Sequence, residues 1–324
     1  MYSDIKGKIK YNEELIGKLI NEGSPVVFTL NKYTTNKEII SWNTGKKFFP
    51  EDMQDASIRI GYMLDNARLV GLDDLAMPDQ PTNEKLIEEC HELTLEEILG
   101  FYQTETAQRE GTLWNVDKNY SAIFMRKSTY DEVQNLTGRS VSLVFPCADC
   151  AVARFYDPEH DVIGITHSDA VHTTREIIPK SVKYMEEHFG TDPSKLEVFV
   201  GAFASEGWTY DKLPAFALDK DEYGNPTGLN SVWQGYIVPD GDRYQILYGE
   251  IIFDQIASTG VRVENISFSP DNTLFDDNYF SNSRSFNTKV NGITTYREGR
   301  NMMGITFGKE KVLENKEAQN VIIR

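Results

Sequence analysis

The chain has 324 residues, of which 40% are apolar and 11% aromatic, and 50 acidic side chains against 33 basic ones give a net charge of −17. A chain of this length can bury a large core, whereas its negative charge disfavours binding to nucleic acid and to anionic membranes, since both select positive surfaces. The first residues form no apolar run, and no stretch approaches the roughly 20 apolar residues that span a bilayer, which predicts a cytoplasmic protein. Three cysteines are too few for a disulfide framework, so chemistry or burial explains them better.

The N-terminal third predicts few elements. Val26 to Leu30 favours a strand, and Glu51 to Val70 has the apolar spacing of an amphipathic helix, which Gly71 ends. Residues 77–129 are acidic and weakly patterned, so they are predicted to be a variable region. Within it, Asn83 to Gly100 favours a helix whose carboxylates form a solvated face.

From residue 140 onward the pattern predicts alternating elements of both kinds. The expected order is strands at Val141–Phe145, Ala151–Tyr156 and Val162–Thr166, a helix at Thr173–Phe189, a strand at Leu196–Val200, a polar insertion at 219–243, a helix at Ile246–Ser258 and a strand at Val261–Phe268. Pro179 cannot donate to the Arg175 carbonyl, so the first of these helices is expected to start late or to kink near its beginning.

Cys150 and His167 stand near the two ends of a predicted hairpin. Its turn is expected at Asp157 to His160, with Pro158 at the position that a type I turn favours. In that register, cross-strand partners have numbers that sum to 317, which places Cys150 opposite His167. Directly opposed Cβ atoms lie about 4.5 to 5.5 Å apart. This is close enough for a nucleophilic cysteine–histidine pair or for two ligands of one metal.

The motifs around this pair resemble those of one known family. Ala148-Asp149-Cys150, followed by a strand, a turn with Asp157-Pro158 and the segment Ile163-Gly164-Ile165-Thr166-His167-Ser168, resembles the hallmark of the laccase-domain family, also called polyphenol oxidase or peptidoglycan editing factor proteins. Further segments keep the family's order: Tyr130–Val133 before Gly138, Val198–Gly201, Ala257–Ile266, Phe280–Arg284 and Gly299-Arg300.

The resemblance implies a mixed α+β fold, a four-layer α/β/β/α sandwich. It implies one domain over residues 1–324, with a core at 130–307. The family is similar to purine nucleoside phosphorylases and adenosine deaminases, and some members are linked to peptidoglycan editing. Its zinc is held by one cysteine and two histidines with an open fourth position; copper is the less favoured metal. Cys150 and His167 match two of these ligands.

The chain departs from the family at two places. The family's first histidine lies in a Gln-Val-His-Gly motif, and its best counterpart here ends at Thr82, a poor zinc ligand; a second alignment offers Glu105. The Gly-Trp-Arg/Lys-Gly segment after the second histidine is replaced by the segment from Asp169 to His172. His91 or His172 is an alternative source of the missing imidazole.

Other residues leave a structural and a functional interpretation open. Cys147 forms Cys-x-x-Cys with Cys150, and the pair with His167 and His172 has the spacing of a zinc finger without its helix, so packing explains Cys147 better. Arg284 and Arg300 are candidates for substrate contact, although surface arginines are the more common case.

The sequence therefore predicts a zinc-dependent enzyme that acts on a small molecule, a purine nucleoside with phosphate, through Cys150 and His167. Two alternatives remain: a metal-free hydrolase in which His167 activates the Cys150 thiolate, and a binding protein that has lost catalysis. The oligomeric state and the third metal ligand stay open.

Overall fold

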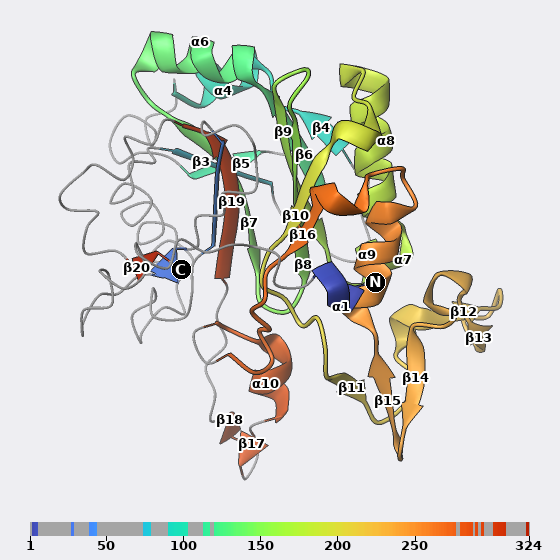
Figure 1. Cartoon of the computed structure of the whole chain (residues 1–324). Helices are drawn as coiled ribbons and strands as arrows, with labels where there is room; N and C mark the ends of the chain where they lie inside the picture. Colours follow the sequence, from blue (N-terminus) through green and yellow to red (C-terminus); the bar gives the residue numbers. More distant parts are fainter. Residues whose placement is uncertain are drawn as a thin grey trace.

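Two packed β-sheets form the centre of the molecule, and helices cover one of them (Figure 1). The computed structural model describes residues 2–5, 27–28, 39–43, 74–78, 90–102, 113–116, 120–276, 279–287, 289–290, 293–294, 301–308 and 322–323. None of the helices in this described part has the length and the continuous apolar character needed to cross a membrane.

The first sheet has six strands and carries the predicted hairpin at its centre. Its order is β16 (Ile266–Phe268), β10 (Glu197–Val200), β8 (Ala151–Asp157), β9 (Val162–Ser168), β6 (Ala122–Arg126) and β4 (Cys90–Glu92). Every residue of β8 and β9 is buried, because both faces of the sheet are covered.

The second sheet has five strands and packs face to face on the first. Its order is β2 (Ile39–Asn43), β19 (Asn301–Phe307), β7 (Val141–Cys147), β3 (Asp74–Pro78) and β5 (Leu113–Val116). Alternate side chains of β7 and β8, among them Leu143, Phe145 and Val152, form one core with Ile165 and Met303 between the sheets.

Helices cover the other face of the six-stranded sheet, with α7 (Ala170–Thr174), α8 (Ile177–Phe189) and α9 (Tyr248–Ala257) side by side (Figure 1). Their apolar residues, such as Val182 and Ile252, form a second core with Phe155 on the sheet. The mixed α+β fold is thus confirmed, with one helical layer and two sheet layers in the described residues. The helix predicted at Glu51–Val70, on which a fourth layer would depend, lies outside them.

The remaining elements surround this centre. They are α1 (Tyr2–Ile5), β1 (Val27–Phe28), α4 (Leu95–Tyr102), α6 (Lys127–Thr137), β11 (Trp208–Tyr210), β12 (Leu218–Lys220), β13 (Pro226–Leu229), β14 (Ile237–Asp240), β15 (Arg243–Ile246), α10 (Asn282–Asn287), β17 (Lys289–Val290), β18 (Ile293–Thr294) and β20 (Ile322–Ile323). The predicted insertion at 219–243 is folded, because β14 joins β15 and β11 in a three-stranded sheet.

Two predicted elements need correction. The helix expected at Asn83–Gly100 is wrong in its middle, where Cys90–Glu92 is strand β4, held by parallel pairing with β6; helix α4 follows. The strand expected at Val261–Phe268 is confined to β16, since Val263–Asn265 makes a 3₁₀ turn first.

The hairpin of β8 and β9 is confirmed, but its predicted register is wrong by two residues. Asp157 pairs with Val162, and His167 therefore pairs with Val152 rather than with Cys150. The turn begins one residue later than predicted, because Asp157 stays in the ladder and Asp161, with a φ of 49°, closes the turn in the left-handed region. An even shift preserves the faces of a strand, so Cys150 becomes a diagonal rather than a direct neighbour of His167.

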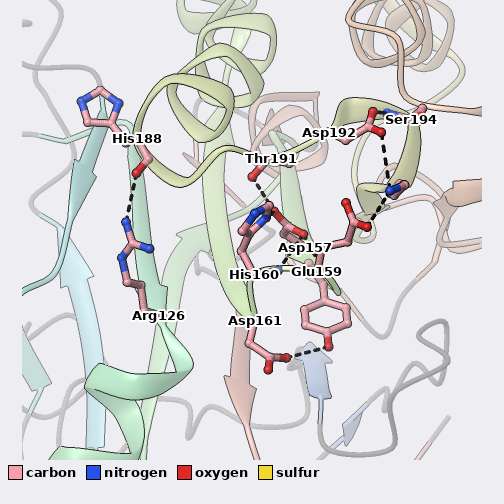
Figure 2. A network of polar contacts seen from close by, with 11 residues as sticks. Arg126, Asp157, Glu159, His160, Asp161, His188, Thr191, Asp192 and Ser194 are labelled. Carbon is pink, nitrogen blue, oxygen red and sulfur yellow. Dashed lines mark hydrogen bonds and ion pairs between the residues drawn. The ribbon is translucent and has the colours of Figure 1, made fainter.

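A polar network holds this turn against the end of α8 (Figure 2). Asp157 is 2% exposed and accepts hydrogen bonds from Thr191 Oγ1 at 2.6 Å and from the backbone N–H groups of Glu159 and His160. His160 Nδ1 lies 2.8 Å from the second carboxylate oxygen. The carboxylate therefore joins the hairpin to the chain that leaves α8.

The helix predicted at Thr173–Phe189 is divided, as Pro179 indicated. Helix α7 ends at Thr174, Glu176 has a φ of 57°, and α8 starts at Ile177. With no N–H on Pro179, a continuous helix would leave the Arg175 carbonyl without its partner, so the chain breaks there. The break lets the first turn of α7 face the end of β9.

Candidate functional site

A cavity of 590 Å³ opens where β7, β9, β11 and α7 end or begin. It is lined by residues 146–150, 169–171 and 208–211 together with His167, Phe216, Arg243, Tyr248, Asn282 and Ser283. This volume is within the range of roughly 300 to 1,000 Å³ that is usual for small-molecule sites.

Asp149 fixes the loop that carries Cys150. Its carboxylate, on a residue only 6% exposed, accepts hydrogen bonds from Thr273 Oγ1 at 2.8 Å and from the Ser283 backbone N–H at 2.6 Å. Its carbonyl accepts from the Ala204 N–H at 3.0 Å. Three segments distant in sequence are thereby joined behind the cavity, and the thiol of Cys150 is held at its wall.

Cys150 and His167 both line this cavity. Cys150 is partly buried, His167 is almost fully buried, and the His167 backbone N–H donates to the Ser121 carbonyl at 2.9 Å. The ring of His167 lies 5.8 Å from that of Phe145, measured between centroids. The hairpin therefore brings the two predicted residues to one cavity, although they are not opposite each other.

Asp169 and His172 extend the cluster around His167. Asp169 caps the N-terminus of α7 by accepting from the His172 backbone N–H at 2.8 Å, and His172 Nδ1 lies 2.7 Å from Oδ1 of the same carboxylate. Burial raises the pKa of Asp169, but the contact with His172 and the nearby imidazole of His167 outweigh it and hold the pKa well below its usual range. One potential ligand atom from each of His167, Asp169 and His172 lies within 4.8 Å of the other two.

Aromatic rings form one wall of the cavity. Trp208 lies 5.1 Å from Tyr248, 5.4 Å from Tyr210 and 5.9 Å from Phe216, measured between ring centroids. Burial, together with the charges of Asp149 and Cys150, raises the pKa of Tyr210 to about 12. Burial also raises the pKa of Tyr248, so both hydroxyls keep their protons at neutral pH.

Charge in the cavity is mainly negative. Asp149, Asp169 and Asp211 line it, and Arg243 is the single lysine or arginine among the described lining residues. Arg243 Nε donates to Asp211 Oδ1 at 2.9 Å, in a pair that is substantially exposed.

None of the other predicted site residues is among the described residues that line the cavity. Thr82, Glu105 and Arg300 lie outside the described residues. Arg284 donates to the carbonyls of Asp276 at 2.9 Å and Tyr279 at 2.5 Å, which is a loop-stabilising arrangement, and it does not line the cavity. His91 contacts Glu97 at 2.8 Å, away from the cavity.

Several cavity residues went unnoticed in the sequence. Trp208, Tyr210 and Arg243 come from a segment that looked like polar insertion and its flank, and only the pairing of β11 with β15 brings them together. Asp169 and His172 were visible as departures from a motif. Asp169 and His172 follow His167 by two and five residues, at the point where the strand ends and a helix begins. This spacing is the sequence signal that they could lie close to His167.

Comparison with known proteins identifies relatives of this fold. The family model for multi-copper polyphenol oxidoreductase laccases matches residues 83–305. Three solved structures are similar: hypothetical protein YfiH of Bacillus licheniformis (TM-score 0.60, 16% identity, covering 89% of this chain and 98% of that one), YlmD of Geobacillus stearothermophilus (0.57, 14%, 84% and 93%) and Neisseria meningitidis protein NMB0706 (0.53, 13%, 87% and 99%). No curated protein matches the chain.

Proposed function

Because the chain belongs to the multi-copper polyphenol oxidoreductase laccase family, we propose that it is a metal-dependent enzyme that deaminates a purine nucleoside in the 590 Å³ cavity. The observation that carries the proposal is the meeting of Cys150 and His167 with an aromatic wall at one cavity. The wall supplies binding for a flat base, and the two side chains supply donors for a metal.

The aromatic wall suits a purine. Trp208 and Phe216 lie with their rings 20° from parallel, at 5.9 Å between centroids, and Tyr248 lines the cavity beside Trp208, at 5.1 Å between centroids. Stacking of a base on one aromatic ring contributes about 1–3 kcal/mol and tolerates different bases. Thr209 and Asp211 line the same rim and offer hydrogen-bonding groups for ribose hydroxyls.

The donor atoms in the cavity fit zinc. A thiolate and an imidazole are the ligand types that zinc prefers, and Cys150 and His167 present both to the cavity. When bound with an open coordination position, zinc lowers the pKa of a water ligand to about 7. The counterparts of the family's first histidine, Thr82 and Glu105, lie outside the described residues.

Charge favours deamination over phosphorolysis. Asp211 is paired with Arg243, and the carboxylates of Asp149 and Asp169 offset the charge of a bound zinc ion. The cavity therefore offers little net positive charge to a phosphate dianion, whereas a neutral nucleoside and a water molecule need none. Deamination consumes water and releases ammonia, so it needs no anion. Among the described lining residues, Arg243 favours phosphorolysis, because its guanidinium would bind phosphate once the ion pair with Asp211 opens.

The test uses the full chain, with and without added zinc, and adenosine, inosine and methylthioadenosine as substrates. We expect ammonia release from adenosine, no dependence on added phosphate, and loss of activity in Cys150→Ala and His167→Ala. Trp208→Ala should raise KM by about tenfold, as loss of one stacking contact predicts. Tyr223→Ala is the matched control, because Tyr223 is an 81% exposed aromatic of the insertion that does not line the cavity.

Other outcomes would identify the alternatives. Phosphate-dependent release of the base would replace deamination by phosphorolysis. Metal-free protein in which Cys150 is alkylated rapidly, with His167→Ala slowing the reaction, would favour a cysteine hydrolase. Nucleoside binding without turnover in zinc-loaded protein would favour a binding protein that has lost catalysis.

A further inference from the structure

Three potential metal ligands meet where β9 ends and α7 begins. His167 is the next-to-last residue of β9, Asp169 is the N-cap of α7, and His172 lies in the first turn of that helix. Their ligand atoms lie within 4.8 Å of one another. The donor atoms of a tetrahedral zinc site lie roughly 3.4 Å apart, given bonds of about 2.0–2.2 Å, so small side-chain rotations would bring these three into range.

One ring nitrogen of His172 is buried without a hydrogen-bond partner. The residue is 5% exposed; Nδ1 faces Asp169 Oδ1 at 2.7 Å, whereas Nε2 makes no hydrogen bond within the described part of the chain. Leaving a buried polar group unsatisfied costs about 1–3 kcal/mol, so an unpartnered ring nitrogen in a native structure needs an explanation. A metal ion that accepts the lone pair of the nitrogen would supply that explanation.

The contact between His172 and Asp169 fixes the orientation of the imidazole ring. Nδ1 lies 2.7 Å from Oδ1, which already accepts the His172 backbone N–H. A neutral imidazole with its proton on Nδ1 donates a hydrogen bond to a carboxylate oxygen at that distance, which leaves the lone pair of Nε2 available to a metal ion.

The cavity gives access to this cluster. His167 and Asp169 line the cavity, while His172 lies behind them, with its ring 5.9 Å from that of His167. Three carboxylates and one guanidinium line the cavity among the described residues, and this excess of negative charge attracts a cation.

We infer that zinc is held by His167, Asp169 and His172, two imidazoles and one carboxylate, and that Cys150 is left as an uncoordinated thiol in the cavity wall. This ligand set rests on the metal dependence proposed above, keeps His167 as a donor, and replaces Cys150, which both the sequence resemblance and the proposed function use as a ligand, by Asp169 and His172. Three protein ligands with an open fourth position are typical of catalytic zinc.

The experiment measures zinc affinity by competition with a chromophoric chelator and the absorption of the cobalt-substituted full chain. We expect His172→Ala to weaken zinc binding by more than about 100-fold, since loss of an outer-shell partner alone costs 10–100-fold. Asp169→Asn keeps the helix cap while removing the charge, so it tests the ligand even if His172→Ala folds poorly.

Cys150→Ser should retain zinc, and the cobalt protein should lack a thiolate charge-transfer band. His160→Ala is the matched control, as its imidazole also pairs with an aspartate but lies in the hairpin turn.

Loss of zinc in Cys150→Ser, or a thiolate band in the cobalt protein, would overturn this ligand set while leaving metal dependence intact. Retention of wild-type affinity in both His172→Ala and Asp169→Asn would do the same. Wild-type protein that binds neither zinc nor copper would overturn the ligand set and the metal dependence together.

Discussion

Replacing Asp157 with asparagine should destabilise the whole chain, because this carboxylate joins the hairpin turn to the end of α8 (Figure 2). Asparagine keeps one oxygen for the backbone N–H groups but presents an amide where Thr191 and His160 now bond at 2.6 and 2.8 Å. Hydrogen bonds to charged groups contribute about 1.5–3 kcal/mol each. The His160 side chain is 37% exposed, which reduces its share, so we expect a total loss of about 2–3 kcal/mol.

The loss should depend on pH in a defined direction. Burial raises the pKa of Asp157, but hydrogen bonds from Thr191, from the His160 ring and from two backbone N–H groups lower it more, so the folded pKa is below the ordinary value. The stabilisation is complete above the unfolded pKa of about 3.9 and disappears as the pH falls through the lower folded value. The difference between the wild type and Asp157→Asn should therefore be largest near neutral pH and shrink below about pH 4.

Urea unfolding followed by circular dichroism at several pH values measures both effects. Asp219→Asn, an exposed aspartate of β12, is the control and should leave the transition unchanged. A loss below about 0.5 kcal/mol at neutral pH, or a difference that persists undiminished in acid, would refute the reasoning.

Other predictions concern packing and single hydrogen bonds. Gly164→Ala places a Cβ 2.4 Å from the Phe124 ring and should cost about 1–3 kcal/mol in thermal unfolding, with Phe124→Leu restoring part of it. Trp233→Phe removes the 2.7 Å hydrogen bond from the indole to Thr174 Oγ1, and should speed limited proteolysis of the 219–243 insertion without changing that of the sheets. Tyr248→Phe removes the hydroxyl that donates to the last carbonyl of β9, and should lower the free energy of unfolding by about 1–2 kcal/mol, measured in urea.

Local patterns predicted the central elements well. Alternating and continuous apolar runs located β7, β8 and β9, and the missing N–H of Pro179 predicted the break before α8. The hairpin register was missed by two residues because a side-chain effect decides it: Asp157 bonds to the turn's backbone N–H groups while remaining in the ladder. Strand β4 could not be predicted because three residues are too few to show the alternation of apolar and polar side chains that is typical of a strand. Only its pairing with β6 makes the segment a strand.

The candidate site was predictable only in part. Cys150 and His167 were found because their motif is continuous with the strands that carry them, and both line the cavity. Trp208 and Arg243 have no local signal, since only the antiparallel pairing of β11 with β15, which are separated in the sequence by the insertion, brings them to one cavity. The position of Arg284 depends on backbone carbonyls that no sequence pattern reveals.

The carboxylate of Asp149 also bears on how the protein folds. Its two partners, Thr273 and Ser283, lie 124 and 134 residues further along the chain. Closing loops of that length is entropically costly and slow, because the ordering precedes the contacts that compensate it. The hairpin can therefore form early, whereas its pocket should be completed among the last events of folding. An arrested or C-terminally shortened polypeptide would then hold both strands and still lack a place for a ligand.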